Sequence, residues 1–210
     1  MTHFVEDAHP NISSQGELVF HRRTPGRTPV IVKMSTLPNA ENDPSSQREI
    51  AEGENPDWLG DEIIYYASFP QSGLHLMDAG GGNQRLILES QTKLVPNAAP
   101  NGEQVAVSIK TDNRWQICVF SASQGQKSLI QITETSNADN YLPTWSPDNN
   151  HLVFVSNRDN QWAVWVMQAN GTNQRLLFTL PGSIDGTITS PDIDRNLSGG
   201  WFEEQLSWTP

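Results

Sequence analysis

The sequence predicts an all-β protein made of about four four-stranded antiparallel blades, a β-propeller or part of one. Short apolar runs recur with turn residues between them, and the runs group into units of about 40 residues. No stretch keeps the period of an amphipathic helix. With 210 residues, of which 36% are hydrophobic, the chain can bury a core. We predict one domain over residues 1–210, with repeats at about 10–52, 53–92, 93–137 and 138–180.

The first unit has recognisable second, third and fourth strands at residues 16–20, 29–34 and 47–50, with a largely polar insertion at residues 35–46. No convincing first strand precedes them. Residues 181–210 are predicted to be a connection and a terminal strand, Leu206-Ser207-Trp208-Thr209-Pro210, which resembles a first strand without its blade. Pairing of that strand beside residues 17–20 would complete the first blade and close a small ring. A fragment of a larger propeller, or a ring completed by a second chain, is the alternative.

The second and third units have all four strands. The second opens at Pro56-Asp57-Trp58 and continues through residues 62–66, 74–77 and 83–87. The third opens near Ala98, which stands where the other units have tryptophan, and continues through residues 104–108, 116–120 and 128–133. Because Ala98 lies 40 residues after Trp58 and 47 before Trp145, the period matches one propeller blade.

The fourth unit has the clearest motif, Pro143-Thr144-Trp145-Ser146-Pro147-Asp148, followed by an apolar strand, Ser156-Asn157-Arg158-Asp159 and a strand that ends at Met167. This pattern resembles the TolB-like (WD-like) β-propeller repeat. The resemblance covers about residues 10–178 and implies a propeller that serves as an interaction domain. In that family such domains occur in periplasmic complexes, on sensor kinases and on prolyl-oligopeptidase-like hydrolases.

The strand interiors indicate how the units pack. Residues 63–65, 105–107 and 152–154 are consecutively apolar, so both faces of these strands must be covered, as they are between neighbouring blades. We assign structural roles in the repeat to Trp58, Trp145, Pro147, Asp148, Arg158 and Trp208. Gly80-Gly81-Gly82 leads into a strand and is predicted to be a hairpin turn rather than a phosphate cradle.

Charge and composition limit the partners. The formal net charge of −11 repels phosphate backbones, so nucleic acid is not an expected partner. No apolar run is long enough for membrane insertion, and residues 1–10 lack the pattern of a signal peptide. Periplasmic, extracellular and cytoplasmic locations all remain open, as do a homo-oligomer and a larger parent chain.

The motifs for chemistry are weak. The five histidines are scattered, no nucleophile elbow is present, and neither a catalytic residue nor a cofactor or metal is predicted. One stretch has oxygen ligands at calcium-loop spacing, although Leu197 replaces the glycine of the sharp turn. Calcium there is a minor alternative to a polar connection between blades, and its ligands would be Asp192, Asp194, Asn196 and Glu203.

These observations favour a non-enzymatic scaffold that binds a protein or peptide at one end of the propeller channel, where loops and first strands converge. By position in the repeat, the residues expected near that rim are Asp57, Asn97, Asn140, Tyr141 and Thr144. The acidic balance favours a basic or neutral partner. The main rival is a propeller domain detached from a larger enzyme, such as a prolyl-oligopeptidase-like hydrolase or a receptor-like kinase. A glycan enzyme on a five-bladed propeller ranks last.

Overall fold

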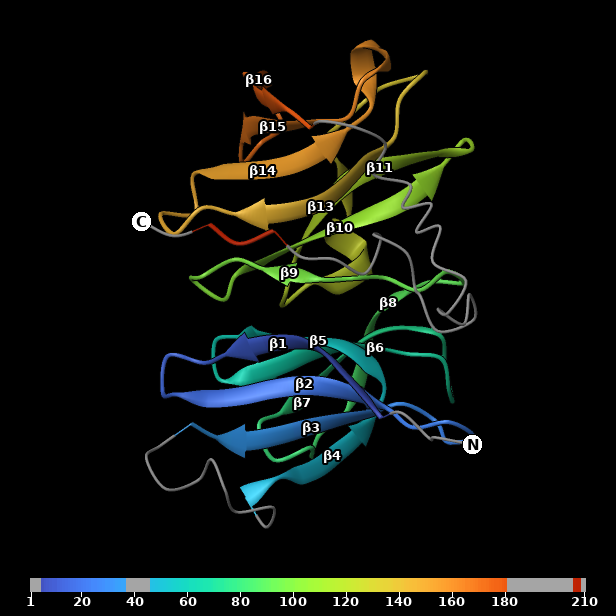
Figure 1. The fold of residues 1–210 in the computed structure, drawn as a ribbon, viewed down its shortest axis with the longest axis vertical. Helices are drawn as coiled ribbons and strands as arrows, with labels where there is room; N and C mark the ends of the chain where they lie inside the picture. The colour runs from blue at the N-terminus through green and yellow to red at the C-terminus, as the bar shows by residue number, and fades with distance from the viewer. Residues whose placement is uncertain (1–4, 37–45, 181–205, 209–210) are drawn as a thin grey trace.

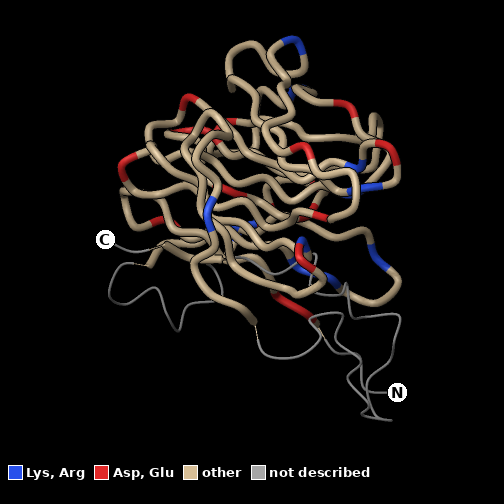
Figure 2. The backbone as a smooth tube through the Cα atoms, turned by 90° about the horizontal axis from the view of Figure 1, so that it is seen from above, with Lys and Arg blue, Asp and Glu red and all other residues tan. Residues whose placement is uncertain are grey.

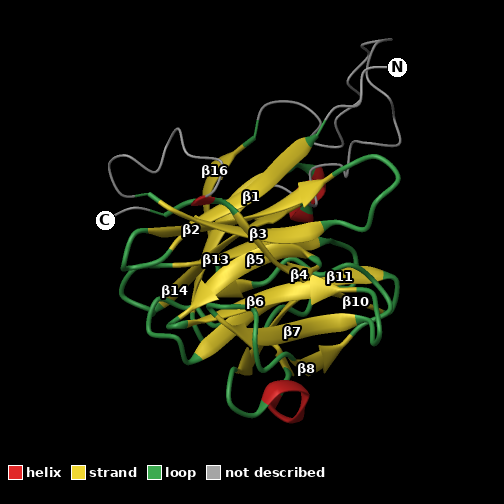
Figure 3. Cartoon of the chain, turned by 90° about the horizontal axis from the view of Figure 1, so that it is seen from below, coloured by secondary structure: helices red, strands yellow, loops and turns green. Residues whose placement is uncertain are grey.

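The fold is a four-bladed β-propeller, seen in a computed structural model that describes residues 5–36, 46–180 and 206–208. Each blade is an antiparallel four-stranded sheet in which the strands follow one another in chain order. Figure 1 shows blades 1 and 2 in the lower half of the molecule and blades 3 and 4 in the upper half. In the described part of the chain, helix is confined to short turns (Figure 3), which agrees with the absence of helical periodicity in the sequence.

The strand bounds are as follows. Blade 1 has β1 (Glu6–Ile12), β2 (Glu17–Arg23), β3 (Val30–Ser35) and β4 (Arg48–Glu52). Blade 2 has β5 (Glu54–Leu59), β6 (Glu62–Ala67), β7 (Gly73–Asp78) and β8 (Arg85–Glu89). Blade 3 has β9 (Asn97–Ala98), β10 (Gln104–Thr111), β11 (Arg114–Ser121) and β12 (Ile130–Gln131). Blade 4 has β13 (Asn140–Trp145), β14 (His151–Ser156), β15 (Ala163–Gln168) and β16 (Arg175–Thr179).

Blade 1 corrects one prediction. Its first strand is present as β1, which pairs with β2 from Glu6 opposite Arg23 to Ile12 opposite Leu18. The other edge of β2 is occupied by β3, so no edge of β2 is left for a C-terminal strand, and the predicted closure at residues 17–20 is wrong. The sequence pattern did not predict this strand because Ile12 stands where the repeat has a tryptophan.

Apolar side chains fill the space between successive blades. Val19 and Ile31 of blade 1 pack with Ile63 and Met77 of blade 2. Equivalent clusters join blade 2 to blade 3 and blade 3 to blade 4. The far face of blade 4 carries four buried valines, at positions 153, 155, 164 and 166, and residues 206–208 pack against them. Strands buried on both faces therefore account for the consecutive apolar residues.

The repeat tryptophans contribute to these clusters. Trp145 is buried at 3% exposure in the cluster between blades 3 and 4. Trp58 is partly buried against the cluster between blades 1 and 2, and Trp208 against the valines of blade 4. Trp58 and Trp145 each pack toward the preceding blade, and Trp208 packs in the same way toward blade 4.

A glycine in the turn before the fourth strand of blades 2, 3 and 4 brings each of these blades close to the preceding one. Gly81, Gly125 and Gly171 all have positive φ, and at each of them a Cβ would overlap the carbonyl oxygen of the fourth strand of the preceding blade or of the residue just after it. The three carbonyls belong to Ile50, Ile87 and Ile132. The predicted hairpin at residues 80–82 is confirmed, and its glycine is required by blade packing as well as by the turn.

Candidate functional site

The tryptophan position of the repeat is occupied by Ile12, Trp58, Ala98, Trp145 and Trp208. In each blade, the residue just before this position links one inner strand to the next. These linking side chains bond to the inner strand of the next blade. The bonds run from Asn11 Nδ2 to Pro56 O (2.8 Å), from Ala98 N to Asp57 Oδ2 (2.7 Å), from Trp145 N to Asn97 Oδ1 (2.9 Å) and from Thr144 Oγ1 to Leu206 O (3.2 Å). Leu206 therefore accepts from blade 4 a bond like those that link one inner strand to the next.

A bulge lies just upstream of this position in blades 1, 2 and 4. The residues at the bulge are His9, Asn55 and Leu142, with φ of 54°, 53° and 53°, and each precedes a proline. The strand register shifts at each bulge and the pairing then continues. In blade 3 the corresponding residue is Val95, which has no positive φ because its β-branched side chain disfavours that conformation. Pairing in blade 3 does not continue upstream, and β9 is only two residues long.

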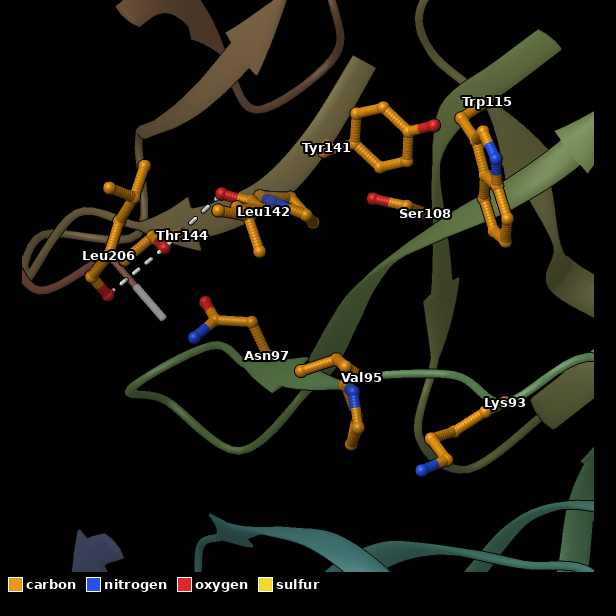
Figure 4. A pocket seen from close by; sticks show the side chains of 11 residues that line it. Lys93, Val95, Asn97, Ser108, Trp115, Tyr141, Leu142, Thr144 and Leu206 are labelled. Carbon is orange, nitrogen blue, oxygen red and sulfur yellow. Dashed lines mark hydrogen bonds between the residues drawn. The ribbon is translucent and has the colours of Figure 1, made fainter. Parts of the chain in front are cut away.

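A pocket of about 50 Å³ lies where the upstream part of the inner strand of blade 3 is missing (Figure 4). Residues 95–97 form one wall, and residues 141–144 of β13 form another. Ser108 of β10 and Trp115 of β11 lie between these walls, with Lys93 and Leu206 completing the lining. The pocket is therefore a direct consequence of the short β9 strand, and we take it as the candidate functional site, the blade 3–4 pocket.

Ser108 has the most informative side chain in the pocket. Its Oγ is buried and makes no hydrogen bond with the described residues. Figure 4 shows the hydroxyl below the Tyr141 ring, pointing away from Trp115. A buried hydroxyl without a partner costs free energy, so such a group is usually satisfied by water or a ligand. In the other complete blades this strand position lies opposite an inner-strand residue, for example Tyr66 opposite Glu54.

Aromatic rings form the upper part of the blade 3–4 pocket. The ring centroids of Trp115 and Tyr141 are 5.5 Å apart, and Tyr141 also approaches Trp162 at 6.1 Å. Burial raises the pKa of the Tyr141 hydroxyl, so it stays neutral at physiological pH. These rings give the pocket an apolar surface with polar groups at its edges, which is typical of a recognition site.

The charged groups around the pocket are paired. Lys93 Nζ lies 3.0 Å from Glu54, and Arg114 lies 3.1 Å from Asp139. Asp139 also accepts a hydrogen bond from the backbone N–H of Trp115 at 2.9 Å, which holds the tryptophan in place. Elsewhere, Lys and Arg residues are scattered over the molecule rather than gathered on one face (Figure 2).

Three of the five residues predicted from the sequence for the channel rim line the pocket: Asn97, Tyr141 and Thr144. Asn97 and Thr144 also make the links between blades described above. Asp57 is buried in such a link, and burial raises its pKa to about 7 although the N–H groups of Ala98 and Trp58 lower it. Sequence reasoning missed Ser108 and Trp115, since both lie in ordinary strand patterns.

Asn140, the fifth, is fully buried in a polar network between blades 3 and 4. Its side-chain amide donates to Gln116 at 3.0 Å and accepts from Arg158 at 2.8 Å. Arg158 also donates to Gln174 at 2.7 Å, and its guanidinium stacks over Trp165 at 4.6 Å from the ring centroid. The structural role assigned to Arg158 thus corresponds to a link between the β14–β15 and β15–β16 turns.

Asp148, which was assigned a structural role in the repeat, lies in the turn after β13. Its carboxylate accepts from the Ser146 hydroxyl and from the backbone N–H of Asn150, and these bonds lower its pKa to about 2. Pro147 precedes it in the same turn after β13.

The calcium alternative at Asp192, Asp194, Asn196 and Glu203 lies outside the described residues. Within the residues that the structure describes, no three His, Cys, Asp or Glu side chains gather into a metal-binding group. No helix in this part of the chain has the length and apolar character needed to cross a bilayer.

Comparisons with known proteins agree with the predicted resemblance. The chain is 32% identical over 105 residues to the Tol-Pal system protein TolB of Anaeromyxobacter dehalogenans, covering 50% of this chain and 23% of that protein. The solved structure of TolB from Acinetobacter baumannii superposes with a TM-score of 0.65 at 16% identity, over 83% of this chain and 43% of that one. The resemblance to the TolB-like propeller is confirmed at the level of fold.

A peptidase is also similar in sequence. Dipeptidyl-peptidase 5 of Porphyromonas endodontalis is 28% identical over 101 residues, covering 45% of this chain and 14% of that protein. The chain therefore spans less than a quarter of the length of TolB from Anaeromyxobacter dehalogenans and of this peptidase. No family model matches the sequence.

Proposed function

We propose that the chain is a non-enzymatic binding module that holds a segment of a partner protein or peptide at the blade 3–4 pocket. The observation that carries the proposal is the buried hydroxyl of Ser108, which has no hydrogen-bond partner among the described residues and lies in the pocket lined by Trp115 and Tyr141. Rigid blades around a pocket with aromatic walls and few polar groups are suited to recognition.

Two further observations support a protein or peptide partner. The TolB relative is named as a protein of the Tol-Pal system, which favours a role within a protein assembly. The net charge of −11 disfavours nucleic acid, and the ion pairs of Lys93 and Arg114 leave the pocket surroundings close to neutral. A neutral or basic peptide fits these charges best.

Selection from a phage-displayed peptide library tests the proposal. Purified protein should enrich peptides that bind the wild type and lose at least about tenfold in affinity on Ser108→Trp, because the indole would fill the pocket. Ser123→Trp is the matched control, since Ser123 is exposed in the turn after β11. Bound peptides should be recovered intact by mass spectrometry.

Several outcomes would overturn the proposal. Failure to enrich any peptide would remove its basis, and equal binding to Ser108→Trp and wild type would place the site elsewhere. Recovery of cleaved peptides would contradict the non-enzymatic part. Circular dichroism and the melting temperature of both variants show whether a loss of binding reflects a loss of fold.

A second candidate function is favoured by the similarity to dipeptidyl-peptidase 5. In this alternative the chain is the propeller domain of a larger hydrolase. An antibody against the purified chain would then detect, in native extract, a much larger polypeptide that also reacts with a fluorophosphonate serine-hydrolase probe. A native polypeptide of the size of this chain without such labelling would contradict it.

A further inference from the structure

We propose that an extended peptide adds to β10 as a strand, taking the place of the part of the inner strand that blade 3 lacks. The inference rests on the proposed function and specifies its binding mode. Inner strands β1, β5 and β13 are six or seven residues long, whereas β9 has two residues. Its partner β10 nevertheless has eight residues.

The pairing of β10 shows that one edge is open. On one side, β10 pairs with β11 along its whole length, from Gln104 opposite Ser121 to Thr111 opposite Arg114. Along β9 it is paired only at Val105 and Ala106. An unpaired strand edge is a template for another strand, and proteins normally shorten or cover such edges.

The direction of the backbone groups follows from the register. Ala99 N donates to Gln104 O, so the carbonyl of Gln104 points to the β9 side of β10. Backbone groups alternate in direction along a strand, so the N–H and C=O of Ser108 and Lys110 point to the same side, beyond the end of β9. They are therefore the groups that an added strand would bond.

The blade 3–4 pocket lies beside this open edge. Residues 95–97 diverge from β10, and Ser108 and Trp115 lie within the space between them (Figure 4). A strand bound to Ser108 and Lys110 would therefore place one side chain in the pocket, beside the Ser108 hydroxyl. A volume of about 50 Å³ holds about four water-sized groups, which corresponds to a side chain such as valine or threonine.

The occupant of the pocket should be uncharged. Lys93 is paired with Glu54 and Arg114 with Asp139, so an ionised side chain entering beside Trp115 and Tyr141 would lose hydration without gaining an opposite charge. A hydroxyl-bearing or small apolar side chain avoids this cost, and a hydroxyl would also satisfy Ser108. The partner segment is therefore an extended peptide with alternating small β-branched residues.

The probe is a fluorescein-labelled hexapeptide of alternating valine and threonine, measured by fluorescence anisotropy. In an extended peptide, alternate N–H groups point to opposite edges. Two further versions of the hexapeptide are made: the first carries N-methyl groups on the N–H groups of one edge, and the second carries them on the N–H groups of the other edge. Strand addition predicts that one version loses about tenfold in affinity and the other does not, because only one edge bonds to β10. A peptide held by its side chain alone would respond equally to both modifications, which would overturn strand addition.

The protein side has a matched pair of variants. Lys110→Pro removes the N–H that faces the open edge without removing a bond to β11, whereas Lys110→Ala keeps it. We expect about tenfold weaker hexapeptide binding for the proline variant only. Amide hydrogen exchange at Ser108 and Lys110 should slow when the peptide binds, and unchanged exchange would contradict the proposal.

The outcomes separate this inference from the proposed function. If library peptides bind at the pocket but the hexapeptide does not, or if it binds Lys110→Pro as well as Lys110→Ala, strand addition is wrong and the binding module stands. If neither peptide class binds, both proposals fail. The N-methylated peptides are tested on the wild-type protein, so a folding defect in Lys110→Pro cannot obscure the result.

Discussion

At the residue before the repeat tryptophan position, side-chain chemistry determines which backbone group of the next blade is bound. Asn11 and Thr144 donate to carbonyl oxygens, whereas Asp57 and Asn97 accept from N–H groups. Both arrangements join neighbouring inner strands, which explains why the sequence at this position varies among polar residues. The carboxylate of Asp57 differs from the others because it can ionise.

Burial of Asp57 makes the stability of the protein depend on pH. Its pKa is about 7 in the folded state, above the ordinary value of 3.8, so the folded state binds the proton more tightly. The stabilisation from protonation is complete below pH 3.8 and is lost as the pH rises through 7. Asp57→Asn keeps an acceptor for Ala98 N–H, as Asn97 does for Trp145, and removes the titration.

Urea denaturation at pH 5 and pH 8 checks this prediction. Relative to the variant, the wild type should lose up to about 3 kcal/mol of free energy of unfolding between the two pH values. Only the interval from pH 5 to the folded pKa of about 7 contributes, at about 1.4 kcal/mol for each pKa unit. Contributions from groups other than residue 57 are common to both proteins, so they cancel in the difference. Parallel pH profiles would show that Asp57 is ionised in the folded state without cost.

Single residues were the least predictable part of the site. Position in the repeat predicted both Tyr141 and Asn140 for the channel rim, but Tyr141 lines the pocket whereas Asn140, its neighbour, is directed into the buried network of Gln116 and Arg158. Neighbours on a strand point to opposite sides, and the bulge at Leu142 changes the register there, so spacing alone could not assign them. The open position of Ser108 could not be predicted because it depends on how early the pairing of β9 with β10 stops.

Strands and turns were predictable where residue type and conformation coincide. The hairpin glycines were recognisable, and the strand of residues 62–66 corresponds to β6 within one residue. The first strand of blade 1 was missed because the repeat was recognised by its tryptophan. The signal shared by all four inner strands is a proline two residues before the tryptophan position, at Pro10, Pro56, Pro96 and Pro143. Val95 before Pro96 is the sequence signal for the interrupted strand.

The turn glycines predict a large difference between two similar substitutions. Gly171→Ala should lower the free energy of unfolding by about 2–4 kcal/mol, because the methyl group would overlap the Ile132 carbonyl and separate blades 3 and 4. Gly26 has a similar φ of 79°, but a Cβ there has nothing within 4 Å. Gly26→Ala should therefore cost only about 1 kcal/mol of backbone strain.

Urea denaturation of both variants at one pH provides the measurement. Equal losses would mean that backbone strain accounts for both effects and that the approach of Gly171 to blade 3 contributes nothing. A loss confined to Gly171→Ala would show that this turn holds the two blades at their observed spacing.

At the scale of the whole molecule, residues 206–208 extend the order of the blades instead of closing it. Leu206 accepts from Thr144, and Trp208 packs on the valines of blade 4, as Trp145 packs on blade 3. The repeat predicted that this segment is a first strand; in the structure residues 206–208 have no strand pairing, and only their contacts with blade 4 resemble those of a first strand. Its predicted pairing partner, residues 17–20, was wrong because the sequence pattern did not reveal that blade 1 has its own first strand, β1.

A double-mutant cycle distinguishes the two placements in solution. Trp208→Ala should lower the free energy of unfolding by about 2–4 kcal/mol, because it uncovers part of the valine cluster. Its effect should couple to Val153→Ala by at least about 0.5 kcal/mol, since side chains that pack together do not contribute independently. The effects of Trp208→Ala and Leu18→Ala on the free energy of unfolding should add, because β1 and β3 occupy both edges of β2 and Trp208 does not pack at residues 17–20. Coupling to Leu18 in place of Val153 would restore the closed ring, and no coupling to either would mean that Trp208 does not pack stably on blade 4.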